Sequence, residues 1–299
     1  MNNSTRNFKM KKLLIATTAL VATAGMAAAD VTVSGHAAAG FHSGLTDVTA
    51  DATQATDALE GIYSNAGVDF TMSGATDNGI SFSASVNIDA GNEIDAGDFE
   101  YDGTDGGTAG LGAVSMTGSF GTLTFDNNGI DNLYSDATNH DVSYSTTLGG
   151  VGLTLAYDAT DASANATSAS ATYTAGGMAF TLNASEAAGG TSTDLAVSYA
   201  LNDTVTITAD TDSAAGGASV QTIGASTTLN GVSVAVSSAN NSTWDVDLGY
   251  TAGGFALTYG VDETDAWTAT ATAALGGGAT FAAGVNSEDA TYAGVSFAF

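Results

Sequence analysis

The sequence predicts an all-β protein, a transmembrane antiparallel up-and-down β-barrel of 16 to 18 strands, with 18 the best count. First, short segments alternate apolar and polar residues, as in the run 80–89, which is typical of strands with one apolar face. Second, tight turns alternate with longer, often acidic connections. Third, the chain ends on an aromatic residue, Phe299, which shares one strand face with Val295 and Phe297. Alternating strands, unequal loops and aromatic boundary residues together indicate an outer-membrane barrel.

The first segment of the chain has the pattern of a secretion signal. Residues 1–12 carry Arg6, Lys9, Lys11 and Lys12, an apolar run follows, and 27–29 are three alanines. The apolar run is shorter than the ~20 residues of a transmembrane helix, so it is typical of a signal peptide. We therefore expect 1–29 to be cleaved after export, and 30–299 to form a single barrel domain.

The two kinds of connection divide the rest of the chain into strands. Tight connections such as 76–79, 149–150 and 252–254 supply Gly or Asn for hairpin turns. Longer ones, such as 42–60 and 90–108, would face the outside. Sixteen strands remain an alternative, because segments rich in Ala, Ser and Thr are easily miscounted. The expected strands are 31–41, 61–73, 80–89, 109–118, 121–127, 141–148, 151–158, 167–175, 178–186, 193–201, 204–212, 218–228, 231–238, 243–252, 255–262, 265–275, 279–286 and 290–299.

The composition of the chain excludes nucleic-acid binding and disulfide bonds. All four basic residues lie in 1–12, so 30–299 has no Lys or Arg against 32 Asp and Glu. A nucleic-acid surface needs clustered basic residues and is excluded. The chain also lacks Cys and Pro. It therefore has no disulfides, and no proline interrupts the hydrogen-bonded ladder of a strand.

Periodicity alone does not separate a soluble β-sandwich from a barrel with lipid outside and water inside. The loop alternation and the absence of Lys and Pro to protect sheet edges favour the barrel. Aromatic residues near strand ends on the apolar face add to this, and we expect them at the membrane interface. They are Tyr157, Trp244, Tyr250, Tyr259, Trp267 and Phe299.

The polar face of the strands would then line the lumen. Ala, Gly, Ser and Thr fill most of it and leave room for water, and the remaining positions are acidic. The expected lumen carboxylates are Asp69, Asp89, Asp126, Asp141, Asp158, Asp194, Asp210, Asp245, Asp247 and Asp262.

Two acidic loops are candidate sites. Asp131, Tyr134 and Asp136 in the third long loop could narrow the pore, and the alternative is an ordinary solvated loop. The second long loop could bind Ca²⁺ or Mg²⁺ through four carboxylates, since calcium prefers oxygen ligands. The alternative there is a loose acidic mouth. The four are Glu93, Asp95, Asp98 and Glu100.

These features predict a water-filled channel for passive diffusion of ions and small hydrophilic solutes, with a preference for cations. The alternative is a structural or adhesive outer-surface β protein without channel activity. An enzyme is not expected, because His36, His42 and His140 are scattered and no nucleophile and base converge. Without Lys or Arg, contact with lipopolysaccharide phosphates would have to run through divalent cations.

Several short stretches resemble Gram-negative general porins, in particular those of Rhodobacter-type alphaproteobacteria. They are 30–35, 70–79, 118–121, 275–278 and the terminal Phe-x-Phe. The resemblance implies a homotrimer of 16-stranded barrels in the outer membrane, with the third external loop folded inward. The chain departs from that pattern because its third loop, 127–140, is short. It also has no basic residues to oppose the acidic side of a constriction.

Overall fold

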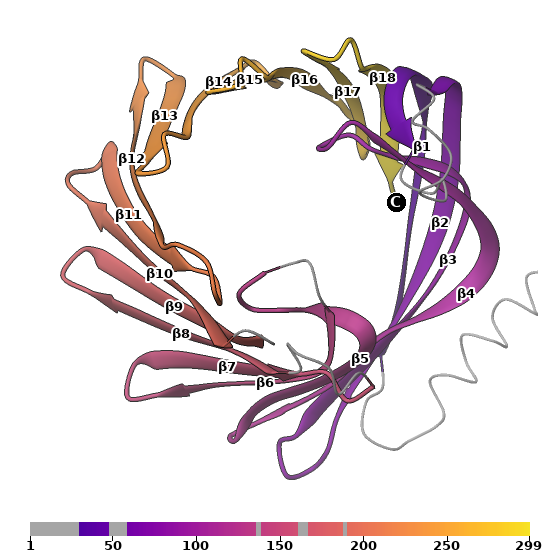
Figure 1. Ribbon diagram of the computed structural model, residues 1–299. Coiled ribbons are helices and arrows are strands. Elements are labelled where there is room, and N and C mark those ends of the chain that lie inside the picture. The colour runs from indigo at the N-terminus through magenta and orange to yellow at the C-terminus, as the bar shows by residue number, and fades with distance from the viewer. Residues whose placement is uncertain (1–29, 48–58, 136–138, 161–166, 188–189) are drawn as a thin grey trace, which may run out of the picture.

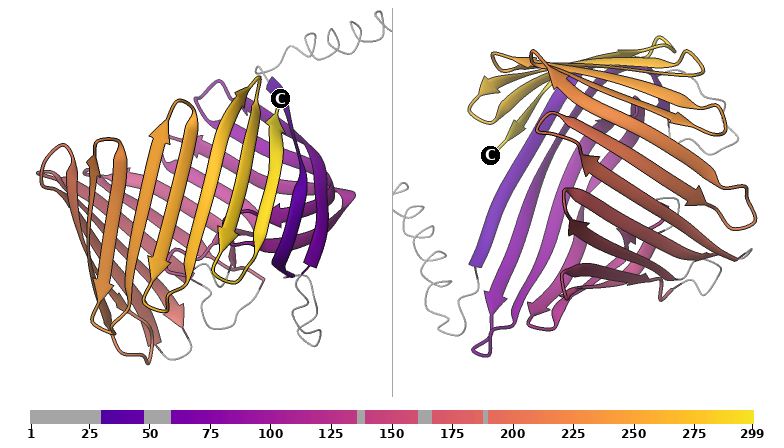
Figure 2. Two further views of the ribbon diagram at one scale, coloured as in Figure 1. Left: turned by 90° about the horizontal axis from the view of Figure 1, so that it is seen from above. Right: turned by 90° about the vertical axis from the view of Figure 1, so that its left-hand side faces the viewer.

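The computed structural model describes residues 30–47, 59–135, 139–160, 167–187 and 190–299. The expected signal peptide, 1–29, and Asp136 lie outside the described residues. Eighteen strands form one sheet that closes into a ring, with hairpins at both ends (Figures 1 and 2). The predicted all-β antiparallel barrel is confirmed, and the described residues form 18 strands rather than 16. Among the described residues, no helix has the length and apolar character to span a membrane.

Each strand pairs with its neighbours in the chain, as in an up-and-down barrel. The strands are β1 (Asp30–Asp47), β2 (Leu59–Ala75), β3 (Ser81–Asp95), β4 (Glu100–Gly118), β5 (Gly121–Asp131), β6 (Asn139–Leu148), β7 (Val151–Tyr157), β8 (Thr167–Ala175), β9 (Met178–Ala187), β10 (Gly190–Ala200), β11 (Val205–Ser213), β12 (Val220–Leu229), β13 (Val232–Ala239), β14 (Trp244–Ala252), β15 (Phe255–Asp262), β16 (Trp267–Gly276), β17 (Ala279–Asn286) and β18 (Thr291–Ala298).

The ring closes where β18 pairs with β1, which also pairs with β2. His36 on β1 lies opposite Ala298 on β18 and opposite Gly67 on β2. Closure leaves no free sheet edge among these strands, so the backbone groups of the ring are paired without Lys or Pro to protect an edge.

The pairing keeps apolar and polar residues on opposite faces around the ring. Across β1 and β2, Val33 pairs with Phe70, and Ser34 pairs with Asp69 on the other face. Apolar residues of the first face remain exposed, with Phe41 at 71% and Leu111 at 72%. Apolar surface of this extent in contact with water would be unfavourable, whereas a lipid environment covers it.

The second long loop, predicted over 90–108, is mostly strand, which corrects that expectation. β3 runs to Asp95 and β4 starts at Glu100, so only 96–99 form the turn. Two register shifts between β3 and β4, at Ile88/Ala90 and at Glu93/Ile94, let this Gly-rich and acidic segment pair despite its loop-like composition. The connection predicted over 187–193 is likewise mostly strand, because β9 ends at Ala187 and β10 begins at Gly190. Long and short connections therefore do not alternate strictly.

The end of the β3–β4 hairpin packs against the seam of the ring. Phe99 is 3% exposed and lies 5.3 Å from the ring of Tyr292 on β18, measured between ring centroids. Leu45 on β1 and Ala290 complete this buried cluster. A short parallel pairing joins Thr46 of β1 to Glu100 of β4. Figure 1 shows the hairpin reaching across to the side of the ring where β1 and β18 meet.

Candidate pore and its lining

A loop between β5 and β6 projects into the ring (Figure 1). Three of its residues are hydrogen bonded to strands far along the chain. The Asn132 amide donates to Ser185 Oγ of β9 at 3.0 Å, and the Leu133 N–H donates to Ser168 Oγ of β8 at 3.0 Å. These serines mark the polar strand face as the inner face of the ring.

Tyr134 makes the third of these hydrogen bonds, to the residue most distant from the loop in the sequence. Its hydroxyl donates to Oδ1 of Asp212 on β11 at 2.9 Å. Burial raises the pKa of Tyr134 above its ordinary value, and the hydrogen bond to Asp212 and the charge of that carboxylate raise it further. The phenol therefore stays protonated at neutral pH and can keep donating.

The local sequence explains how the loop turns inward. Asn132 is 3% exposed, and its Oδ1 accepts the N–H groups of Tyr134 at 2.9 Å and Ser135 at 3.4 Å. An asparagine side chain that caps its own following residues makes a tight turn, which directs Tyr134 towards β11. Asp131, the other described residue of the expected constriction, is exposed and ends β5 opposite Asn139.

The first acidic group lies beside this loop. Asp194 on β10 is paired across from Asp212 on β11, and Asp210 lies two residues before Asp212 on the same face. The Asn183 amide donates to Asp194 at 3.3 Å. Sequence reasoning named Asp194 and Asp210 but missed Asp212. The alternation that places Asp210 on the inner face also places Asp212 there.

The second acidic group lies on β14 and β15. Asp245 pairs with Asp262, and Asp247 lies two residues along the same face as Asp245. Together with Glu288 they line a hollow of about 330 Å³. Asp262 also accepts N–H groups of the turn that follows it, so part of its role is structural.

The other predicted lumen carboxylates lie elsewhere on the ring. Asp69 on β2 and Asp89 on β3 flank the imidazole of His36. Asp141 is 7% exposed and accepts N–H groups from residues 128, 159 and 160, so it organises loops rather than facing open water. Asp158, directly after β7, accepts a hydrogen bond from the N–H of Thr160. Asp126 lies in β5, where the pairing with β6 shifts register.

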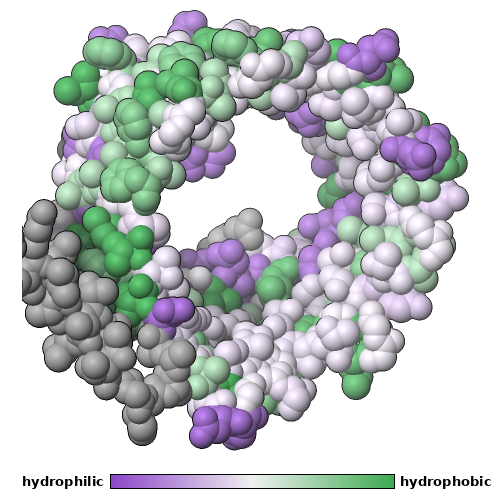
Figure 3. Space-filling view, turned by 180° about the vertical axis from the view of Figure 1, so that it is seen from behind, coloured by the Kyte–Doolittle hydropathy of each residue, from purple (hydrophilic) through white to green (hydrophobic). Residues whose placement is uncertain are grey.

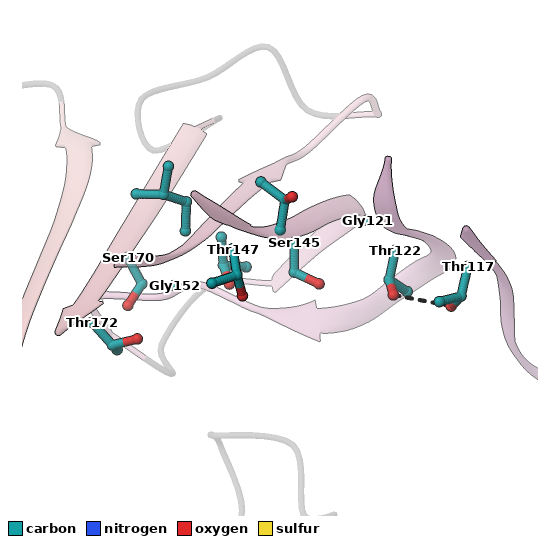
Figure 4. Close-up of a pocket in the computed structure, with 11 residues that line it drawn as sticks. Thr117, Gly121, Thr122, Ser145, Thr147, Gly152, Ser170 and Thr172 are labelled. Carbon is teal, nitrogen blue, oxygen red and sulfur yellow. Dashed lines mark hydrogen bonds between the residues drawn. The ribbon is translucent and has the colours of Figure 1, made fainter. Parts of the chain in front are cut away.

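A different part of the wall is neutral and rich in hydroxyl groups. Thr117, Thr122, Ser145, Ser170 and Thr172 line a hollow of about 390 Å³ formed by β4 to β8 (Figure 4). The hydroxyls of Thr117 and Thr122 are 2.9 Å apart and hydrogen bonded. The space-filling view shows an open ring with hydrophilic residues along its inner rim (Figure 3). The wall therefore has acidic and neutral sectors.

The six predicted interface aromatics occupy the outer face of the ring. The register sets Trp267 opposite Val261, and Tyr250 opposite Leu257, both apolar. The rings of Tyr259 and Trp267 stack with centroids 6.3 Å apart. Trp244 begins β14 and Tyr157 ends β7, both on the side of the longer loops, whereas Phe299 follows β18 on the opposite side. Their contact with the membrane interface stays a prediction.

The four candidate calcium ligands lie at the end of the β3–β4 hairpin. Asp95 accepts the N–H groups of Gly97 at 2.7 Å and Asp98 at 3.3 Å, so it caps the turn. In the part of the chain that the structure describes, no three carboxylate or imidazole groups are arranged to hold a metal ion. The binding of calcium by Glu93, Asp95, Asp98 and Glu100 stays a prediction.

A closed barrel with a polar interior into which a loop projects defines a channel-forming membrane protein. The model of the Gram-negative porin family matches residues 16–298, and the chain belongs to this family. The resemblance inferred from sequence is thereby confirmed, and membership identifies an outer-membrane porin. The expected 16 strands do not hold, since this member has 18.

Solved porin structures share the fold at low sequence identity. Two mutants of the porin of Rhodopseudomonas blastica are 14% and 15% identical to the chain, with TM-scores of 0.52 and 0.50. A structure described as "asymmetric conductivity of engineered proteins" is 16% identical with a TM-score of 0.50. Each alignment covers 90% of this chain and 100% of the other. No curated protein matches the chain.

Proposed function

We propose that the barrel is a water-filled channel for passive diffusion of ions and small hydrophilic solutes, and that it prefers cations. One observation carries the preference: carboxylates occupy the inner face while 30–299 contain no Lys or Arg. The group Asp194, Asp210 and Asp212 lies where the inward loop is attached, so permeating ions pass close to it.

Fixed negative charge concentrates cations and repels anions in a narrow aqueous path. The effect depends on salt, because the Debye length is about 10 Å at 0.1 M and about 3 Å at 1 M. The preference should therefore be strong in dilute salt and weak in concentrated salt.

The inward loop sets the size limit of the path in this proposal. Asn132 and Tyr134 hold it against β9 and β11, so the space between the loop and the opposite wall limits solute size. The neutral hydroxyl sector offers hydrogen bonds to uncharged hydrophilic solutes, with no charged group among the residues that line it.

Export, assembly and contact with the membrane involve other parts of the chain. Residues 1–29 direct export, three barrels associate, and the six outer aromatics contact lipid at the membrane interface. Divalent cations held by the acidic hairpin 93–100 bridge to lipopolysaccharide phosphates, because no basic residue of 30–299 can contact them directly.

Refolded protein 30–299 in planar bilayers, under a KCl gradient, tests the function. We expect conductance steps in groups of three and a reversal potential that favours K⁺. A reversal potential favouring Cl⁻ would refute the cation preference. Correctly inserted protein without any channels would favour the structural or adhesive alternative.

A further inference from the structure

His36 stands on the inner face of β1 between two carboxylates of neighbouring strands. Its Nδ1 lies 3.8 Å from Oδ2 of Asp69 on β2, and its Nε2 lies 3.4 Å from Oδ1 of Asp89 on β3. The side chain of His36 is 42% exposed, so solvent in the lumen reaches it. The two nitrogens face different carboxylates, which suits a proton on each nitrogen rather than one shared metal ion.

The backbone beneath this imidazole is shaped for it. Gly67 lies opposite both His36 and Asp89 in the ladder. A Cβ at Gly67 would overlap the imidazole ring and Oδ1 of Asp89. Only glycine leaves room here for the ring to cross β2 and reach β3. The Asn87 amide donates to the other oxygen of Asp89 at 2.8 Å and holds that carboxylate in place.

One oxygen of this arrangement lacks a hydrogen bond. Within the described part of the chain, Oδ1 of Asp89 is shielded from solvent and accepts no hydrogen bond. A shielded carboxylate oxygen without a donor is unfavourable. Protonated imidazole has an N–H on both nitrogens, so it can serve Asp69 and Asp89 together.

The surroundings of His36 contain few other titratable groups. Asp69 faces it from β2 and Asp89 from β3, while the β18 residue opposite it is Ala298. The other two histidines are buried, His42 at 8% and His140 at 0% exposure. His36 is therefore the histidine that can bring a positive charge to the water-exposed inner face of the described chain.

We propose that His36 determines selectivity: its protonation places a fixed positive charge on the pore wall and weakens the cation preference as pH falls. This inference rests on the cation preference of the proposed function. Histidine side chains ordinarily change charge between pH 5 and 8. With a neutral imidazole between them, two ionised carboxylates act with a charge of about −2. With an imidazolium between them, the local charge is about −1.

The expected change in the permeability ratio follows from the screened Coulomb interaction between the imidazolium and a permeating ion. One unit charge at about 8 Å in water, screened at 0.1 M salt, changes the local concentration of a monovalent ion by about 1.5-fold. We therefore expect the K⁺ to Cl⁻ permeability ratio in dilute KCl to fall by at least about that factor between pH 8 and pH 5.5. In 1 M KCl the change should nearly vanish, because the Debye length is then about 3 Å.

Reversal potentials of the refolded protein at both pH values test this inference with three variants. His36→Gln removes the charge change and should lose about 1.5-fold of the pH effect while keeping the ratio at pH 8. His36→Lys carries a permanent charge and should show a lowered ratio already at pH 8. His42→Gln is the matched control, and its pH effect should equal that of the unchanged protein. Heat-modifiable migration in gels confirms that each variant has folded.

The outcomes separate the two proposals. An unchanged protein without cation preference at pH 8 defeats the proposed function. A cation-preferring protein whose pH effect is absent, or is the same in His36→Gln, overturns the role of His36. The latter result would assign the pH effect to carboxylates of the acidic sectors.

Discussion

Gly35 and Phe299 join the first strand of the barrel to the end of the last. The Gly35 N–H donates to the main-chain oxygen of Phe299 at 2.6 Å, and the Phe299 N–H donates back to the Gly35 oxygen at 2.9 Å. The aromatic ring of Phe299 lies over Gly35, where a Cβ would overlap it. A residue without a side chain on β1 therefore lets the terminal aromatic cover the seam.

Replacing Gly35 by Val should weaken this seam. The new side chain meets the Phe299 ring, and overpacking of this kind costs about 1–3 kcal/mol. The midpoint of urea unfolding, followed by gel migration, should fall, whereas Ala39→Val on the same strand face should change it little. Adding Phe299→Ala to Gly35→Val should recover part of the loss. Equal midpoints for Gly35→Val and the Ala39 control would contradict this account.

Removing the Tyr134 hydroxyl should loosen the inward loop. Tyr134→Phe keeps the ring but loses the hydrogen bond to Asp212, and bonds to charged groups contribute about 1.5–3 kcal/mol. We expect higher and noisier single-channel conductance, with the ion preference nearly unchanged because Asp212 keeps its charge. Tyr173→Phe on β8, exposed on the outer face, is the control. Unchanged conductance in Tyr134→Phe would mean that the loop is held without this bond.

Neutralising the acidic group beside the loop should reduce the cation preference. The triple change Asp194→Asn, Asp210→Asn and Asp212→Asn removes three charges from one sector. At about 1.5-fold for each charge in 0.1 M salt, the K⁺ to Cl⁻ permeability ratio should fall about threefold. Asp77→Asn with Asp203→Asn, both in short turns, should leave the ratio close to its starting value. An equal fall in both proteins would show that overall charge, not its position, sets selectivity.

Truncating Phe99 should release the β3–β4 hairpin from the seam. Phe99 is 3% exposed against Leu45 and Tyr292, and removing a buried phenylalanine side chain costs about 3–5 kcal/mol. Phe99→Ala should lower the unfolding midpoint and expose 96–99 to limited proteolysis. Leu111→Ala, on the outer face of β4, should do neither. Continued protease resistance of Phe99→Ala would indicate that the strand pairing alone holds the hairpin.

Much of the barrel could be predicted from local patterns. Alternation in runs such as 80–89 identified strands and their faces, and Gly or Asn pairs located the short turns. The prediction failed at 90–108, because acidic and Gly-rich residues suggest a loop. There the pairing of β3 with β4 continues through two register shifts, which no local pattern reveals.

The sequence by itself determined most of the strands, a count of 16 to 18, and the face on which a carboxylate in a strand lies, because side-chain direction in a strand alternates with period two. Only the tertiary structure decided which of those residues meet. Tyr134 and Asp212 are 78 positions apart, and the loop brings them together across the ring. His36 on β1 reaches Asp89 on β3 across the intervening strand β2 because Gly67 on β2 has no side chain to block it. Such contacts depend on register and ring closure, which are set by pairing between distant strands rather than by any short stretch of chain.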